Sequence, residues 1–234
     1  MLAPMRGAVR PPAGAARAVA AGLVVLVASG CGGIGQSAPY DSQGIDGLVI
    51  PTPTPDPDDF EASIDNPWLP LTPGSTWRYD VTDGGAVIGS IEADVLADTA
   101  DIAGLAATVL RTTTTIDTEA ETSSTRFYAQ DDDGNVWWLG EDAGDVTWRA
   151  GEAGAEAGLA MPAFPRLGDG WRPYVVDALP EASVRVEQQG RDMVQTRDEA
   201  DTSTLRTYTA GVGLVGVEDL DSGWQVDLVD HQDG

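Results

Sequence analysis

One stretch near the middle of the chain restricts the fold more than any other. Residues 124–141 contain two runs rich in aromatic and β-branched side chains, separated by three aspartates and Gly134. Glycine readily takes the left-handed conformation that a tight hairpin turn needs. Phe127, Tyr128 and Val136 suit a pleated, half-buried surface. The stretch therefore predicts the central hairpin of an antiparallel sheet.

Strand-length runs separated by turn signals continue over residues 75–229. In the first run, Trp77, Tyr79 and Val81 alternate with polar residues, which is typical of a strand with one covered face. No helical period follows the leader. The sequence predicts an all-β fold, a strongly bent antiparallel sheet or barrel-like meander of about eleven strands. Residues 150–170 break the pattern, and we expect a long irregular segment that covers one end of the sheet.

The N-terminus has the organisation of a secretory leader. A basic segment precedes the apolar run 18–28, which is too short to span a bilayer but matches the core of a signal peptide. The small residues before Cys31 resemble a bacterial lipobox, although Ala28 stands where leucine is usual. This predicts a lipoprotein signal peptide over residues 1–30 and acylation of Cys31, with palmitate-type chains. The alternative is an ordinary secretory leader with a chance cysteine.

Lipidation at Cys31 would place the protein at a membrane and would make the residues that follow a linker to the folded domain. Several acyl chains hold a protein stably on a bilayer, so we expect a lipid-anchored protein on the extracytoplasmic face of the cell membrane. Residues 31–61 are rich in proline, glycine and aspartate and predict an extended linker. Residues 62–234 are expected to form a single β-domain. Within it, segment 64–71 should enter as an extended plug on the sheet edge, and His231 should lie in a frayed tail.

Charge and composition restrict the partners. The chain has 13 basic residues, all of them arginine, against 38 acidic residues, which gives a formal net charge of -25. Such a domain repels nucleic acid, so no nucleic-acid partner is expected. The chain has one cysteine and one histidine, too few for an internal disulfide or a multi-cysteine zinc site, and a Ser-His-Asp triad would depend on that single histidine. We therefore assign no catalytic residue, no cofactor and no metal, and expect a protein that is not an enzyme.

The acidic residues offer two alternatives to this assignment. Asp131, Asp133 and Asn135 begin like a calcium loop, but the sixth and twelfth positions lack the required glycine and glutamate. A solvated turn is favoured, and a looser calcium site on the hairpin tip is the alternative. Glu141 and Asp142 could form the carboxylate pair of a glycosidase, which we regard as the weaker hypothesis.

Two adjacent tryptophans support a ligand-binding hypothesis. Trp137 and Trp138 follow each other in the predicted strand, so their side chains point to opposite faces of the sheet. One of them can join the core. The other packs under segment 150–170 or forms the aromatic wall of an apolar pocket. Together with Met161 and Phe164 of that segment, the two tryptophans are the candidate ligand-facing residues.

A set of short motifs resembles a family. The pattern resembles a group of uncharacterised bacterial secreted proteins and lipoproteins that is frequent in actinobacteria, and it covers roughly residues 64–218. The motifs are NPWLPL from Asn66, PGSTW from Pro73, YAQD from Tyr128, GNVW from Gly134, MPA from Met161 and GVGLV from Gly211. The resemblance implies a bent antiparallel sheet in the cell envelope, and it carries no known activity or substrate.

The sequence thus predicts a membrane-anchored extracytoplasmic lipoprotein that binds an apolar or amphiphilic, lipid-like ligand without catalysis. The alternative is a structural or partner-binding envelope protein whose acidic surface binds a basic partner or calcium.

Overall fold

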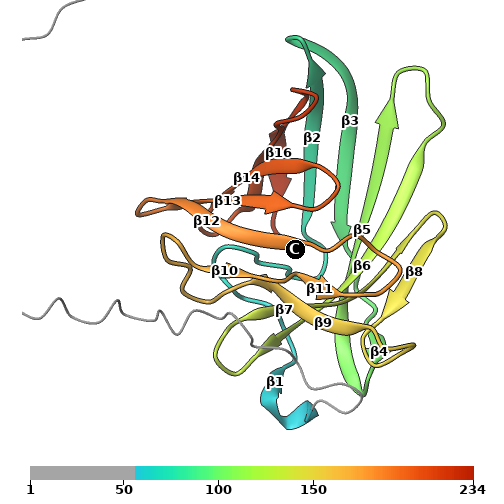
Figure 1. The fold of residues 1–234 in the computed structure, drawn as a ribbon, viewed down its shortest axis with the longest axis vertical. Helices are drawn as coiled ribbons and strands as arrows, with labels where there is room; N and C mark the ends of the chain where they lie inside the picture. Colours follow the sequence, from blue (N-terminus) through green and yellow to red (C-terminus); the bar gives the residue numbers. More distant parts are fainter. Residues whose placement is uncertain (1–55) are drawn as a thin grey trace, which may run out of the picture. The chain divides into compact units, whose positions relative to one another are not determined.

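A computed structural model describes residues 56–234, which form one bent antiparallel sheet (Figure 1). They belong to one compact unit of the chain, Asp41–Gly234. The expected leader, the lipidation site Cys31 and the linker up to residue 55 lie outside the described residues. Across residues 56–234 no helix has the length and apolar character needed to cross a bilayer.

The described residues 56–234 of this unit form one 3-10 turn and sixteen strands. Their bounds are η1 (Pro57–Asp59), β1 (Phe60–Glu61), β2 (Thr76–Asp83), β3 (Ala86–Val95), β4 (Ala100–Ile102), β5 (Leu105–Ile116), β6 (Thr122–Asp131), β7 (Val136–Ala143), β8 (Val146–Arg149), β9 (Glu156–Met161), β10 (Gly170–Trp171), β11 (Tyr174–Val175), β12 (Ser183–Gln189), β13 (Met193–Glu199), β14 (Ser203–Thr209), β15 (Gly213–Asp219) and β16 (Gln225–Gln232).

The predicted fold class, an all-β and strongly bent antiparallel sheet, is confirmed. The number of strands is larger than the expected eleven, mainly because β1, β4, β10 and β11 have only two or three residues each. Strands that short show no alternation of apolar and polar residues, so a sequence pattern does not reveal them.

Strand β9 lies within residues 150–170, where we expected an irregular segment throughout, so that expectation was wrong. Its sequence, Glu156-Ala-Gly-Leu-Ala-Met161, contains no β-branched residue and gives no strand signal. The strand forms because β7 and β11 pair with its two edges. A side chain at Gly158 would collide with the backbone of Arg172 and Pro173, so the tight pairing itself requires glycine there.

The central hairpin is confirmed as β6 and β7. Gly134 has a φ of +84° in the turn, the left-handed conformation predicted for it. Asp131 fixes the turn: its Oδ1 accepts from the backbone N–H of Asn135 at 2.8 Å, and its Oδ2 accepts from Nε1 of Trp137 at 2.8 Å. These bonds explain why the hairpin tip is ordered, since a side-chain acceptor replaces the missing ladder partners.

The order of strands shows how far the sheet bends. It runs β10-β12-β13-β14-β15-β16-β2-β3-β5-β6-β7-β9-β11, with β1, β4 and β8 attached to β6, β5 and β7. The two ends of this order, β10 and β11, are consecutive in the chain, with only Arg172 and Pro173 between them. Because so short a link keeps β10 and β11 close in space, the sheet must curl back on itself until its first and last strands are near each other. No ladder joins β10 to β11, however, so the sheet stays open.

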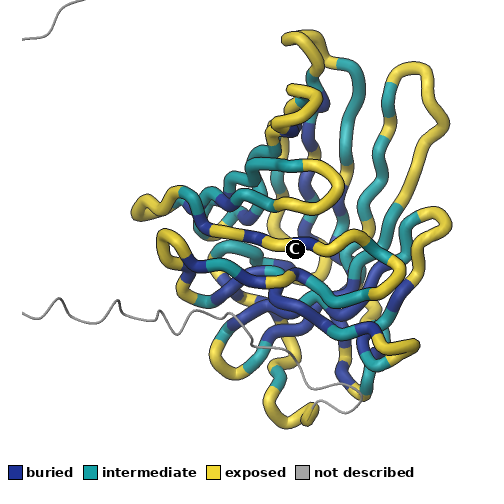
Figure 2. Tube along the Cα trace, viewed as in Figure 1, coloured by how far each residue is buried: buried dark blue, intermediate teal, exposed yellow. Residues whose placement is uncertain are grey.

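Two hydrophobic clusters support this curled shape. The first combines residues of β5, β6, β7 and β9 with Val184 and Val186 of β12 and Val194 of β13. Strands β9 and β12 belong to opposite ends of the order, so a shared cluster means that the two ends pack against each other. The second cluster includes Trp77 and Tyr79 and belongs to the concave side. Figure 2 shows buried residues (dark blue) gathered in the lower half, where the ends meet.

The entry segment 64–71 is held by a buried polar network. Gln130 of β6 is 2% exposed, and its Oε1 accepts from the backbone N–H groups of Asp65 at 3.0 Å and Asn66 at 2.9 Å. The Asn66 side chain donates to the carbonyl oxygen of Gly134 at 2.8 Å and accepts from the backbone N–H of Trp68 at 2.9 Å. These bonds set the position of the segment relative to the sheet.

The C-terminus is ordered, which corrects the expectation of a frayed tail at His231. Strand β16 pairs with β2 as far as Gln232. The His231 ring stacks on Trp77 with ring centres 4.9 Å apart, and its Nδ1 lies 3.1 Å from the carbonyl oxygen of Thr76. Pairing with a long neighbouring strand therefore orders a segment whose position in the sequence suggested fraying.

Candidate functional site

A cavity of about 500 Å³ occupies the concave side of the sheet. This volume lies within the range of typical small-molecule sites, roughly 300–1,000 Å³. Alternate residues of successive strands line it, as the period of two in a β-strand requires. Examples are Trp77 and Tyr79 of β2, Ile91 and Ala93 of β3, Leu110, Thr112 and Thr114 of β5, Ser124, Arg126 and Tyr128 of β6, and Thr204, Arg206 and Tyr208 of β14.

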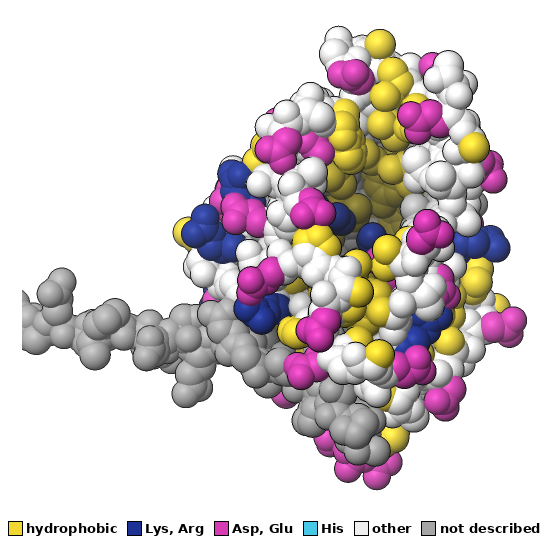
Figure 3. Space-filling model, turned by 45° about the vertical axis from the view of Figure 1, so that its right-hand side comes forward, with side chains coloured by type: hydrophobic (Ala, Val, Ile, Leu, Met, Phe, Trp, Pro, Cys, Tyr) yellow, Lys and Arg dark blue, Asp and Glu magenta, His cyan; other side chains and the backbone are white. Residues whose placement is uncertain are grey.

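Figure 3 shows the cavity as a hollow lined by hydrophobic side chains (yellow), with acidic side chains (magenta) around its mouth and arginines (dark blue) deep inside. Leu69, Pro70 and Leu71 of the entry segment contribute to the lining. The Asn66 and Gln130 network therefore has a second consequence, because it positions part of the cavity wall.

One wall of the cavity is aromatic. The Trp138 ring lies 5.4 Å from Tyr174, nearly perpendicular to it, and 6.4 Å from Tyr128, between ring centres. The Trp148 ring is outside the lining and lies 5.7 Å from Trp138, between ring centres. Such tilted and edge-to-face arrangements are favourable beyond the area they bury, so this wall is preformed and rigid.

Arg126 lies on the floor, among these rings. Its Nε donates to Oε1 of Glu141 at 2.7 Å, and its guanidinium carbon lies 4.9 Å from the centre of the Trp138 ring. Burial disfavours the charged form, but Tyr128 and Glu141 outweigh this effect and hold the pKa of Arg126 above its usual value. The guanidinium is therefore charged and fixed. It is hydrogen-bonded to Glu141 through Nε and also interacts with the Tyr128 side chain, and these contacts leave some of its five N–H groups available.

Arg206 is the second arginine of the floor. Its Nε lies 2.8 Å from Oδ2 of Asp198, but the N–H is not aligned for a hydrogen bond, and the described residues offer this atom no other acceptor. Burial lowers the pKa of Arg206, whereas Asp198 and Tyr208 raise it more, so the side chain stays charged. Arg206 thus keeps unused hydrogen-bonding capacity in a half-buried position.

The two arginines come from distant strands. In the strand order, β14 and β6 are six steps apart, which would be about 29 Å in a flat sheet. In the curled sheet, the positive charge of Arg126 acts on the pKa of Arg206 and opposes its protonation. The curvature therefore places two like charges within electrostatic reach of each other inside an apolar cavity.

Each arginine has a tyrosine two residues later on the same face of its strand. Tyr128 follows Arg126, and Tyr208 follows Arg206. Burial raises the pKa of Tyr79, Tyr128 and Tyr208, so their hydroxyls stay protonated at neutral pH. The Tyr79 hydroxyl donates to the carbonyl oxygen of Leu214 at 3.0 Å. Within residues 56–234, the Tyr208 hydroxyl has no such acceptor, although its side chain is only 8% exposed.

Of the four candidate ligand-facing residues, the structure places Trp138 on the cavity wall. Trp137 lies in the first cluster on the opposite face of β7, as expected for adjacent strand residues. Met161 is fully buried in the second cluster and is not part of the lining. Phe164 is 79% exposed and lies outside the cavity.

Sequence reasoning missed Arg126 and Arg206. A signal was present: the pattern Arg-x-Tyr occurs in both β6 and β14, and in a strand it puts both side chains on one face. Nothing in the sequence shows that the two strands face each other, because that depends on how the whole sheet curls.

The acidic residues considered for a glycosidase or a calcium site are bound to other side chains or to backbone groups of the protein. Glu141 is bound by Arg126, whereas Asp142 is bound by Arg149, with Nη2 and Oδ2 2.6 Å apart. Arg149 lowers the pKa of Asp142 through this contact. Asp131, the first residue of the calcium alternative, has both carboxylate oxygens in hydrogen bonds. In the described range, no group of three or more acidic, histidine or cysteine side chains is arranged to hold a metal.

Comparison with known proteins gives two similar solved structures. A protein from Bacteroides fragilis NCTC 9343, described as exported and as having a YmcC-like fold, aligns with a TM-score of 0.40 and 12% identity over 71% of this chain and 99% of its own. A protein from Parabacteroides distasonis ATCC 8503, described as a lipoprotein, aligns with a TM-score of 0.31 and 9% identity over 70% and 98%. No family model and no curated protein matches the chain.

Proposed function

We propose that this protein is a binding module that holds an apolar or amphiphilic small molecule in the concave cavity, without catalysis. The observation that supports the proposal is the cavity itself, about 500 Å³ in volume and walled mainly by aromatic and aliphatic side chains. Apolar area that is left open in the interior of a soluble domain is normally filled or closed during folding. A preformed apolar cavity of this size is the usual form of a small-molecule site.

We further propose that the domain works as a lipid-anchored protein outside the cytoplasmic membrane, related to the actinobacterial secreted lipoproteins that its motifs resemble. The support is the lipobox-like sequence before Cys31 and the proline-rich linker that follows it. Anchoring by acyl chains would keep the cavity close to a source of amphiphilic molecules.

Native mass spectrometry tests the binding role. The unit Asp41–Gly234 contains both hydrophobic clusters and is the part to purify, gently, from a bacterial host. We expect an added mass of several hundred daltons by order of magnitude, as for a molecule that fills such a site, and its loss on denaturation. A bare chain that also takes up no added dodecanol would overturn the proposal.

A matched pair of variants assigns any bound mass to the cavity. Ala160 of β9 lines the cavity, so Ala160→Phe should reduce its free volume and remove the ligand. Ala106 of β5 is exposed and outside the lining, so Ala106→Phe adds the same ring without filling the cavity. We expect the ligand to be retained in the second variant and lost in the first.

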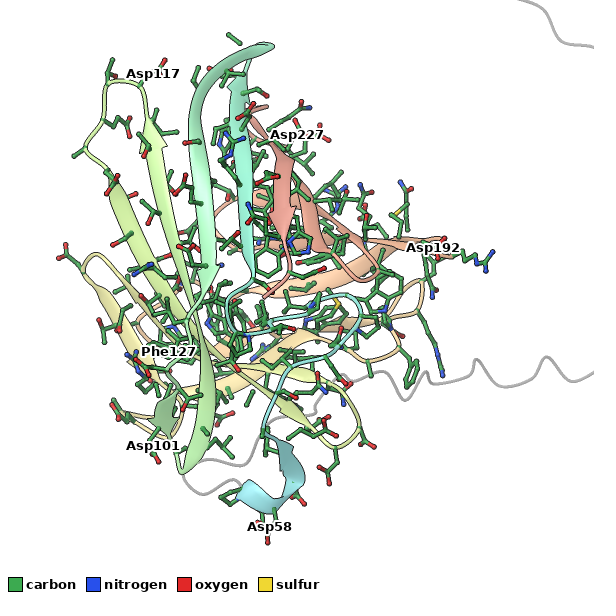
Figure 4. All side chains as sticks on the ribbon, turned by 180° about the vertical axis from the view of Figure 1, so that it is seen from behind. Asp58, Asp101, Asp117, Phe127, Asp192 and Asp227 are labelled. Atoms are coloured by element: carbon green, nitrogen blue, oxygen red, sulfur yellow. The ribbon has the colours of Figure 1, made fainter. Side chains whose placement is uncertain are left out.

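The acidic surface supports a second function, binding of a basic or cationic partner, calcium included. The net charge is -25, and Figure 4 shows Asp58, Asp101, Asp117 and Asp192 at the outer turns and edges of the unit. Binding of this kind depends on charges in solvent, so it should weaken strongly with salt. Association that is insensitive to salt between about 50 mM and 500 mM would argue against it.

A further inference from the structure

We infer that the cavity selects an amphiphile with an anionic oxygen head, a carboxylate or a phosphate monoester, and that Arg126 and Arg206 bind this head. The inference rests on the proposed function and adds the chemical class of the ligand. The tail of the molecule would contact the aromatic and aliphatic wall.

The chain places two of its thirteen arginines in an apolar cavity although its surface is strongly acidic. Both are charged, and each pairs with one carboxylate: Nε of Arg126 is hydrogen-bonded to Glu141, whereas Nε of Arg206 lies 2.8 Å from Oδ2 of Asp198 without a hydrogen bond. These contacts orient the guanidinium groups without using their terminal nitrogens in any hydrogen bond to a carboxylate of the described chain. Two oriented guanidinium groups with unused N–H donors match the acceptor oxygens of a carboxylate or a phosphate.

Further donors in the lining are also without partners. The indole Nε1 of Trp171, a residue that is 5% exposed, is buried and has no acceptor among residues 56–234. The Tyr208 hydroxyl also makes no hydrogen bond within residues 56–234, but it is not a fully buried atom. A buried donor without an acceptor is unfavourable, and native proteins rarely keep one. An oxygen-rich head in the cavity would supply the acceptors that this group of residues lacks.

An anionic head also fits the electrostatics. The like charges of Arg126 and Arg206 oppose each other's protonation, so a negative group near both would relieve that repulsion. A cationic head would add a third positive charge, and a neutral hydroxyl head would add no negative charge to those of Glu141 and Asp198, which already pair with the two guanidinium groups. The cavity should therefore rank ligands of equal tail length as anionic above neutral above cationic.

The test is a titration of the Asp41–Gly234 unit with four ligands that share a twelve-carbon chain and differ in the head group. They are dodecanoate, dodecyl phosphate, dodecanol and dodecylamine, each kept below its aggregation concentration and followed by quenching of tryptophan fluorescence. A salt concentration of about 150 mM screens the acidic surface beyond roughly 8 Å, so attraction of the amine to the exterior does not mask the selectivity of the cavity.

We expect at least one of the two anionic ligands to bind about tenfold to a hundredfold more tightly than dodecanol, as charge-assisted hydrogen bonds provide. The tighter of dodecanoate and dodecyl phosphate identifies the source, a fatty acid or a phosphorylated lipid. If dodecanol binds as tightly as both anions, the inference fails while the proposed function stands. If none of the four binds, the proposed function fails as well.

Variants assign the selectivity to the two arginines. Arg206→Gln and the charge-balanced pair Arg206→Gln with Asp198→Asn should lose the preference for the anion and keep the affinity for dodecanol. Arg197 is the matched control: it lies on the neighbouring strand β13 outside the lining, its side chain is 28% exposed against 29% for Arg206, and it pairs with Glu187. Arg197→Gln should leave the preference unchanged.

Two more conservative substitutions keep the inference testable if the arginine-to-glutamine variants fail to fold. Tyr208→Phe removes one hydroxyl and should weaken anion binding severalfold with no change for dodecanol. Arg126→Lys keeps the charge but not the planar fork, so binding of the anion should fall while dodecanol again binds as before. Anion selectivity that survives in all of these variants would overturn the assignment of the head-group site.

Discussion

Gln130→Leu tests whether the polar network under the entry segment holds the fold and the cavity together. The substitution keeps the approximate volume of the side chain and removes its three hydrogen bonds, two from backbone N–H groups and one to Oδ1 of Asp65 at 2.7 Å. The N–H of Asn66 is then buried without an acceptor. Its desolvation costs about 1–3 kcal/mol and each lost bond about 1 kcal/mol, so we expect a loss of roughly 3 kcal/mol after partial relaxation.

For a domain of this size, 1 kcal/mol corresponds to roughly 2–4 °C in Tm, so Gln130→Leu should lower Tm by about 6–12 °C. Differential scanning calorimetry measures it, with urea unfolding as a check on the free energy of unfolding. Gln189→Leu is the control, because Gln189 is exposed on β12 and its side chain has no hydrogen-bond partner in the described part of the chain. Equal Tm values for the two variants would refute the reasoning.

The network also predicts a coupling between stability and binding. Leu69 and Leu71 line the cavity, and the Asn66 turn that precedes them loses its anchor in Gln130→Leu. Affinity for dodecanol should therefore fall together with Tm, whereas Gln189→Leu should change neither.

Two further outcomes follow from the structure. Burial raises the pKa of Tyr79, Tyr128, Tyr174 and Tyr208, so absorbance at 295 nm should show them ionising above the value of about 10 found in the unfolded chain. Because the folded pKa is the higher one, their contribution to stability is complete below pH 10 and is lost as the pH rises beyond it; a normal titration of all tyrosines in the folded unit would contradict this. His231→Ala removes the ring stacked on Trp77 and should cost about 1 kcal/mol, while Gln232→Ala, at the exposed neighbouring position, should leave Tm nearly unchanged.

The central hairpin could be predicted because its information is local. Asp131 and Gly134 specify the turn, and the alternation of apolar residues on either side specifies the two strands. The opposite directions of Trp137 and Trp138 followed from the period of two alone, and the structure places one in the core and the other in the cavity.

The features that could not be predicted depend on residues far apart in the chain. Strand β9 exists because neighbouring strands accept its small residues, and the order of His231 comes from its pairing partner β2. The joint location of Arg126 and Arg206 depends on the cumulative curvature of six strand steps. No local pattern contains that curvature, so sequence reasoning named one residue of the aromatic wall, Trp138, and missed both arginines.

The short link between β10 and β11 limits which part of the sheet can move to open the cavity. Trp171 and Tyr174 are three peptide steps apart, so their Cα atoms cannot separate by more than about 11 Å. Pro173 within the link has a fixed φ, which makes the link stiff as well as short. The link holds the two ends of the sheet together on one side, as a clasp would. Widening of the cavity mouth must therefore come from movement of the turns at the far ends of β2, β3, β5 and β6. Amide hydrogen exchange should accordingly be slow around β9 and β12 and fast at those turns, and a bound molecule would enter and leave by the side opposite the clasp.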